Sequence, residues 1–165
     1  MKKIIAIMLV LTVVLAFAAC GKTEAKDEFA KSEGVMTYEE YAAAALDAEV
    51  TIETYVQAKQ SWWEKDGVGV ATIYTQDGDG AYFLYEMPCS KEDFDKMVPG
   101  TKLKVKGFKA EWSGEVEIVD ATLTVIEGNY VAPFTDATEK LGTADIVKYQ
   151  NMKLAFKGLT FVRMT

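Results

Sequence analysis

Histidine is absent from the chain of 165 residues, and cysteine occurs only twice. Without histidine the chain lacks the commonest general base of enzymes and the usual activator of a cysteine or serine nucleophile. Two cysteines cannot build a disulfide-rich scaffold. Acidic residues outnumber basic residues by 25 to 18, and the net charge of −7 does not suit a protein that binds nucleic-acid phosphates. These absences argue against an enzyme, a disulfide scaffold and a nucleic-acid binder.

Residues 1–19 have the three parts of a secretory signal peptide. Two lysines follow the first methionine, residues 4–17 are almost continuously apolar, and two alanines complete the segment. The apolar run is shorter than the roughly 20 residues that a permanent membrane-spanning helix needs. We therefore predict a removable signal that directs the protein out of the cytoplasm.

The signal ends in Phe17-Ala18-Ala19-Cys20, which resembles the lipobox of bacterial lipoproteins. The resemblance implies that Cys20 becomes the new N-terminus and carries acyl chains such as palmitate. Acyl chains contribute about 0.8 kcal/mol per buried CH₂ group, so several would hold the protein on the outer face of the cell membrane. The alternatives are a plain signal peptide with an incidental cysteine and an N-terminal anchor helix. Cleavage before Cys20 leaves 16 basic residues against 25 acidic residues, a net charge of −9.

Residues 20–36 are polar and aperiodic, which is typical of a flexible tether. A helix is predicted next, because Thr37 and Glu40 have the spacing of a capping box. The mostly small and apolar residues that follow continue this helix to about Asp47.

Three strands are predicted to follow, because the apolar residues now alternate with polar ones. The strands span residues 50–56, 68–76 and 81–87. A hairpin turn, Asp77-Gly78-Asp79-Gly80, joins the last two strands. Strict alternation in the third strand places Met87 on the face opposite to Leu84.

A short helix and two further strands complete the predicted domain. Ser90 is the expected N-cap of the helix, and Pro99-Gly100 is its stop signal. The strands span residues 103–110 and 115–126. A lysine row, formed by Lys102, Lys104 and Lys106, is expected on one face of the fourth strand as a solvated surface or as a contact for an anionic ligand. Glu115 and Glu117 of the fifth strand are expected to face this row.

The sequences PGTKLKVKG at residues 99–107 and GEVEIVDA at residues 114–121 resemble the last two strands of bacterial OB-fold proteins. The whole chain is similar to OB-fold lipoproteins of Gram-positive, Clostridia-like bacteria. The resemblance implies a mainly β domain over residues 37–127. Its architecture would be a five-stranded OB-fold barrel with a helix between strands three and four, preceded by a short helix. Another small antiparallel barrel or roll is the alternative.

Residues 128–165 are predicted to be a linker followed by a strand. The helical lead at residues 144–149 and the strand at residues 154–162 echo the start of the OB-like domain. This strand is therefore expected either to begin a truncated second OB-like unit or to dock on the first one.

The OB-fold resemblance also implies where a ligand would bind, because OB-folds bind oligonucleotides and oligosaccharides across strands two and three and the flanking loops. Aromatic side chains on that surface would stack on the ligand. The candidate ligand-binding residues are Trp62, Trp63, Tyr74, Tyr82 and Trp112. We expect the three tryptophans to be exposed, because their neighbours are polar or small. The alternative is that these aromatic residues pack inside the domain.

Other motifs favour structural roles. Asp77 and Asp79 lack the further carboxylates of a calcium loop, so a turn is expected. Cys89 is expected to be a half-buried packing residue, and no cofactor or metal site is predicted. The sequence therefore predicts a non-catalytic, membrane-anchored, extracytoplasmic binding module for a glycan, a peptide or an envelope protein. A structural or assembly component of the cell envelope is the alternative, and oligonucleotide binding is a weaker one.

Overall fold

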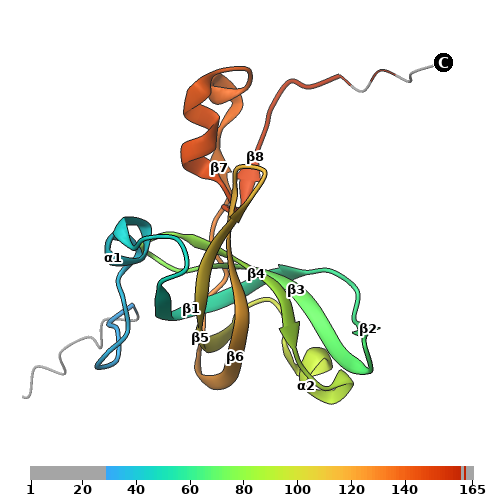
Figure 1. The fold of residues 1–165 in the computed structure, drawn as a ribbon. Coiled ribbons are helices and arrows are strands. Elements are labelled where there is room, and N and C mark those ends of the chain that lie inside the picture. The colour runs from blue at the N-terminus through green and yellow to red at the C-terminus, as the bar shows by residue number, and fades with distance from the viewer. Residues whose placement is uncertain (1–28, 161, 163–165) are drawn as a thin grey trace, which may run out of the picture.

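The computed structural model describes residues 29–160 and residue 162, which form a mainly β protein, as predicted (Figure 1). The predicted signal peptide, Cys20 and the first part of the predicted tether lie outside these residues. The elements are, in chain order, α1 (Tyr38–Ala43), β1 (Glu49–Lys59), β2 (Trp63–Lys65), β3 (Val68–Gln76), β4 (Ala81–Pro88), α2 (Lys91–Lys96), β5 (Thr101–Trp112), β6 (Glu115–Asn129), β7 (Thr135–Asp136), the 3-10 helices η1 (Thr138–Lys140) and η2 (Ala144–Tyr149), and β8 (Leu154–Ala155).

Six strands form one sheet whose hydrogen bonds close into a ring. Its strand order is β1-β5-β6-β4-β3-β2, and an additional pairing joins β1 to β3. Within this sheet β4 and β6 pair in parallel, and the other pairs are antiparallel. The helix α2 connects β4 to β5, as the sequence predicts, and β2 is an additional short strand. The strands β7 and β8 form a separate parallel pair.

The core fills the inside of the ring with side chains from alternating strand positions. Ile52 of β1 and Leu103 and Val105 of β5 are at most 1% exposed, as their alternation predicts. The helix α1 adds Tyr41, whose ring packs edge-on against Tyr82 of β4 with centroids 5.0 Å apart. Burial of each such side chain contributes roughly 1.5–3 kcal/mol, which favours the closed ring over separate strands.

A bulge in β4 changes which side chains face the core. Ala71 of β3 pairs with Met87, whereas Ile73 pairs with Leu84, so β4 has one residue more than β3 between these pairs. Glu86 lies in this bulge with a φ of +49°. The extra residue turns Met87 to the same side as Leu84, and both are fully buried. The prediction that Met87 faces away from Leu84 is therefore wrong.

A second bulge lies in β6. Lys106 of β5 pairs with Thr122, whereas Phe108 pairs with Val119, so β6 has the extra residue here. Asp120 lies between these pairs with a φ of +47°. The two bulges explain why simple alternation fails along both strands.

Two tight turns connect antiparallel strands. Asp66 and Gly67 join β2 to β3 with φ values of +52° and +80°. Ser113 and Gly114 join β5 to β6 with φ values of +52° and +87°. Positive φ at both central residues is the geometry of a type I′ hairpin turn, which matches the twist of the flanking strands.

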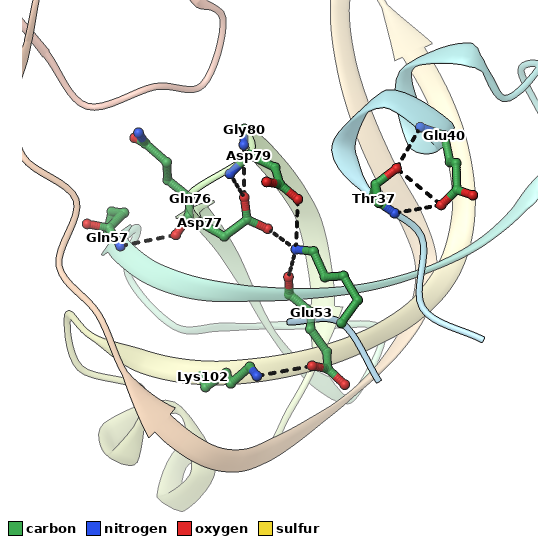
Figure 2. Close-up of polar contacts among 10 residues, drawn as sticks. Thr37, Glu40, Glu53, Gln57, Gln76, Asp77, Asp79, Gly80 and Lys102 are labelled. Atoms are coloured by element: carbon green, nitrogen blue, oxygen red, sulfur yellow. Dashed lines mark hydrogen bonds and ion pairs between the residues drawn. The ribbon is translucent and has the colours of Figure 1, made fainter. Parts of the chain in front are cut away.

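The predicted turn between β3 and β4 is confirmed. Both the Asp79 and the Gly80 amide donate a hydrogen bond to Asp77 Oδ1 over 2.8 Å (Figure 2). The other Asp77 oxygen lies 2.5 Å from Lys31 Nζ. The Asp77 carboxylate therefore stabilises the turn and binds Lys31 of the N-terminal segment.

Residues 29–36, the described part of the predicted tether, lie against the ring. Lys31 Nζ also donates to the Glu53 carbonyl oxygen over 3.2 Å, and the Met36 amide donates to the Thr51 carbonyl oxygen over 2.8 Å. The Phe29 ring packs edge-on against Tyr130 with centroids 4.8 Å apart. These contacts join the segment to the folded unit.

The helix α1 begins with the predicted capping box and ends earlier than predicted. The Glu40 amide donates to Thr37 Oγ1, and the Thr37 amide donates to the Glu40 carboxylate (Figure 2). Ala44 is extended, and the helix ends before it instead of near Asp47. Lys109 Nζ donates to three backbone carbonyl oxygens at this end, with the Ala44 oxygen at 2.8 Å. A buried cation thus satisfies the Ala42 and Ala44 carbonyl oxygens, which the short helix leaves unpaired, and the Tyr41 oxygen, which also accepts from the Ala44 amide.

The C-terminal segment docks on the ring through side-chain amides. Gln57 Oε1 accepts from the Ala132 amide over 2.9 Å, and Gln76 Oε1 accepts from the Lys153 amide over 2.8 Å. Gln150 Nε2 donates to the Gly114 carbonyl oxygen over 2.7 Å, at the turn between β5 and β6. The predicted strand at residues 154–162 is only two residues long in the described part, where it pairs with β7.

Candidate ligand-binding groove

A groove on the outer face of the ring lies between the β2–β3 turn and β6. It encloses about 470 Å³. Its lining residues are Lys65, Asp66, Val68, Val70, Tyr85, Glu86, Pro88, Glu117, Val119 and Asp120. The groove therefore combines apolar side chains from neighbouring strands with four carboxylates and one ammonium group.

Backbone irregularities supply three of the four carboxylates. Asp66 is in the β2–β3 turn, Glu86 is in the β4 bulge and Asp120 is in the β6 bulge. All three have positive φ, a conformation that non-glycine residues rarely adopt. Bulges can redirect a side chain away from the regular alternation of a strand. Here two bulges and a turn bring their acidic residues to the same groove.

Glu117 is the fourth carboxylate and the most buried one. Its neighbour Ile118 is fully buried in the core, so Glu117 is on the outer side of β6, where it lines the groove. The residue is only 8% exposed. Burial, followed by the negative charges of Glu115 and Glu86, raises the pKa of Glu117. Within the described part of the chain, no hydrogen bond or ion pair compensates its carboxylate.

Tyr85 and Lys65 complete the polar part of the groove. The Lys65 ammonium group forms an ion pair with the Glu86 carboxylate. Hydrogen bonding to Glu86, followed by the charge of that carboxylate, raises the pKa of Tyr85. Tyr85 is 39% exposed, so part of its ring is available to a ligand. The groove therefore already holds one lysine side chain beside a carboxylate and a tyrosine.

Trp62 immediately precedes β2, and Trp63 is the first residue of that strand. Both side chains are half-buried, so the prediction that they are exposed is wrong. Trp62 Nε1 donates to the Cys89 carbonyl oxygen over 3.1 Å. Its ring covers Gly69, where a Cβ atom would come within 2.4 Å of the ring. Trp63 pairs with Val70, a lining residue of the groove. These tryptophans therefore pack the β2–β3 hairpin onto the ring.

The other predicted ligand-binding residues lie in three different places. Tyr82 is fully buried in the core, where it cannot stack on a ligand. Tyr74 is half-buried against Phe83, with ring centroids 4.9 Å apart, and lines a second hollow beneath the C-terminal segment. Trp112 is 73% exposed at the end of β5, as predicted, but does not line the groove. The structure therefore does not bring the five predicted aromatic residues together.

The lysine row faces β1 rather than β6. Lys102 Nζ lies 3.0 Å from Glu53 Oε2 (Figure 2), and Lys106 Nζ lies 3.0 Å from Glu49 Oε1. Burial alone would raise the pKa of Glu53, but hydrogen bonding to Ser32 and the charge of Lys102 lower it. The expected pairing of the row with Glu115 and Glu117 is therefore wrong, and Glu117 has no lysine partner from β5.

Cys89 is a free, half-buried thiol, as predicted. Burial, followed by the charge of Asp93, raises the pKa of this thiol, which disfavours the nucleophilic thiolate. Among the described residues, no group of three or more acidic or cysteine side chains is close enough to hold a metal ion.

The sequence contains a signal for the edge of the groove. Asp66-Gly67 is a strong hairpin dipeptide, and it implies short strands on both sides. It would have predicted β2 and the position of Asp66. The bulges at Glu86 and Asp120 have no comparable signal, because neither residue is a glycine or an asparagine.

No protein-family model matches the chain, and no curated protein matches it at a significant level. None of the helices in the described part has the length and apolar composition to span a membrane.

Proposed function

We propose that the protein is a lipid-anchored, extracytoplasmic OB-fold module that binds its ligand in the groove without catalysing a reaction. Support for the OB-fold comes from the strand pairing. Five strands (β1, β3, β4, β5 and β6) pair in a closed ring, β4 and β6 are parallel, and a helix separates β4 from β5. This order of elements is that of an OB-fold.

The sequence supports the anchor. The apolar signal and the lipobox-like residues before Cys20 favour lipid attachment at that cysteine. The described chain begins at Phe29, so eight residues separate it from Cys20. Fully extended, they would span at most about 30 Å, which would hold the domain close to the membrane surface.

One observation carries the binding function: the groove contains Glu117, a buried residue whose carboxylate has no hydrogen-bond or ion-pair partner among the described residues. A buried, uncompensated charge destabilises the fold, and perturbed carboxylates of this kind concentrate at functional sites. The groove also lies over β3 and β4, the surface that OB-folds use for ligands. We therefore place the ligand there and not on the predicted tryptophans.

The proposal predicts that a ligand of some class stabilises the protein through this groove. The mature chain, residues 20–165 with Cys20→Ser, would be screened by thermal unfolding against peptidoglycan fragments, neutral oligosaccharides, acidic peptides and basic peptides. At least one class should raise the unfolding temperature. Tyr85→Ala should abolish this shift, whereas Trp112→Ala should leave it unchanged. The absence of a shift with every class, or loss of the shift in Trp112→Ala alone, would contradict the proposal.

Lipid attachment is tested separately in cells. An alkyne-labelled fatty acid should label the wild-type protein, which should fractionate with the membrane. Cys20→Ser should abolish the label and release the protein from the membrane, whereas Cys89→Ser should change neither. Equal labelling of the wild type and Cys20→Ser would contradict the proposed anchor.

A further inference from the structure

The charge of the groove selects for a cationic ligand. Four carboxylates line it, and Lys65 is the only basic residue among the lining residues. The ion pair of Lys65 with Glu86 occupies one carboxylate. Asp66, Asp120 and Glu117 remain without an ion pair among the described residues, so the groove carries an excess of negative charge.

Glu117 indicates where the strongest contact would form. Glu117 is a buried residue, only 8% exposed, and its carboxylate neighbours Glu115 and Glu86 oppose its ionisation. A ligand cation would supply the missing opposite charge in a partly desolvated place, where charge-assisted hydrogen bonds are strong. An anionic or neutral ligand would leave the carboxylate uncompensated.

The carboxylates of the groove are spread along it rather than gathered around one point. The described residues contain no group of three or more acidic or cysteine side chains that could hold one metal. The carboxylates instead follow the groove from the β2–β3 turn, past β4, to β6. An extended ligand with several separated cationic groups fits this distribution better than a point charge.

The groove also suits the aliphatic part of a lysine or arginine side chain. Val68, Pro88 and Val119 also line it, and they could pack against methylene groups while the charged end reaches an acidic residue. The exposed ring of Tyr85 offers a face for a cation. The chain itself demonstrates this mode of contact, since Lys65 reaches Glu86 across the same groove.

We propose that the groove binds an extended basic peptide segment, with a lysine or arginine side chain placed against Glu117. This inference rests on the proposed binding function and specifies its ligand. The groove would thus recognise basic segments of other extracytoplasmic proteins or peptides.

Isothermal titration calorimetry tests the inference with a defined probe. The mature chain with Cys20→Ser would be titrated with a hexapeptide of alternating lysine and glycine, and with the same peptide after acetylation of its lysines. The lysine peptide should bind saturably, and the acetylated peptide should not. Glu117→Gln should weaken binding by at least about tenfold, because glutamine keeps the shape of the side chain but cannot form the charge-assisted contact. Equal affinity of the wild type and Glu117→Gln would overturn the inference.

A matched control and a second variant distinguish a contact with carboxylates of the groove from attraction by the net negative charge of the protein. Glu127→Gln removes the same charge from an exposed position of β6 outside the groove, and it should change the affinity by less than about twofold. Asp120→Asn should weaken binding by roughly threefold, because Asp120 is an exposed groove residue. Equal effects of Glu127→Gln and Glu117→Gln would show attraction by net charge alone and would overturn the inference.

The outcome also separates this inference from the proposed function. If the lysine peptide does not bind while a glycan fragment still stabilises the protein in a Tyr85-dependent way, the inference is wrong and the binding function stands. If no class of ligand binds, both proposals fail.

Discussion

Two buried charged residues in this protein have opposite surroundings. Lys109 is 7% exposed and reaches three carbonyl oxygens, so its hydrogen bonds compensate the loss of water. Glu117 is 8% exposed, and no hydrogen bond or ion pair with a described residue compensates its negative charge. Equal burial therefore has different consequences, because stability depends on the partners that a buried charge finds. Lys109 has a structural role, and Glu117 is the residue for which a functional role is proposed.

Replacement of Glu117 by glutamine should stabilise the free protein. The folded-state pKa of Glu117 is raised above its ordinary value of 4.5, so the folded state binds a proton more tightly than the unfolded state. This contribution to stability is present below the unfolded-state pKa and is lost as pH rises through the folded-state pKa. At pH 7, Glu117→Gln should therefore raise the free energy of unfolding by about 0.5–1 kcal/mol, and the gain should vanish below about pH 4.

Urea unfolding at pH 7 and below about pH 4 measures the gain in stability of Glu117→Gln, with Glu127→Gln as the control for the loss of one negative charge. Titratable groups that interact with Glu117 are Glu115, Glu86, Tyr85 and Tyr41, and of these Glu115 and Glu86 oppose its ionisation. A lower stability of Glu117→Gln at pH 7 would contradict the account of this carboxylate.

Replacement of Lys109 by methionine should destabilise the protein by about 2 kcal/mol, because it leaves carbonyl oxygens at the end of α1 without a donor. Lys106→Met is the control on the same strand, since the ion pair of Lys106 with Glu49 is more than half exposed on both sides. It should change the stability by less than about 0.5 kcal/mol. Urea unfolding measures both variants. Similar losses of unfolding free energy in the two would show that the buried hydrogen bonds of Lys109 do not contribute to stability.

At the scale of elements, the bulges of β4 and β6 shape the groove. Each bulge adds one residue, and each places an acidic side chain with positive φ beside the groove. The alternation of the sequence predicted the strands well, because the inward residues of β1, β3 and β5 are apolar. It could not predict the bulges, because an extra residue changes which side chains point into the core without changing the composition of the strand. The groove was therefore missed while most of the core was predicted.

Two variants of Asp120 isolate the backbone conformation at the β6 bulge. Asp120→Gly and Asp120→Ala remove the same carboxylate, but only glycine adopts a φ of +47° without steric cost. The glycine variant should therefore be more stable than the alanine variant by about 1 kcal/mol in urea unfolding. An alanine variant as stable as the glycine variant would indicate that Asp120 does not lie in a left-handed bulge.

At the scale of the whole molecule, the segments before and after the ring belong to one folded unit. Lys31 joins residues 29–36 to the β3–β4 turn, and three glutamine side chains join the C-terminal segment to the ring. Composition could not predict this docking, because these contacts are single polar side chains from distant parts of the sequence. The polar segment 20–36 resembles a tether in composition, although part of it is packed.

Loss of one glutamine contact should loosen the C-terminal segment selectively. Gln57→Ala removes the acceptor for the Ala132 amide and the donor to the Tyr130 carbonyl oxygen. Cleavage after residue 130 by a low concentration of protease should become about tenfold faster, while circular dichroism of the ring is retained. Gln60→Ala is the control, because the side-chain amide of exposed Gln60 donates only to the Tyr74 hydroxyl group among the described residues. Equal cleavage of both variants would contradict the docking.

The most direct test of the binding groove is a nuclear magnetic resonance titration of the mature chain with the lysine–glycine peptide. The account predicts that the largest amide shifts gather at Val70, Tyr85, Glu117 and Val119, and that protons of the peptide's lysine side chains show contacts with the Tyr85 ring. Shifts that gather around Trp112 or the C-terminal segment, or the absence of shifts at saturating peptide, would contradict it.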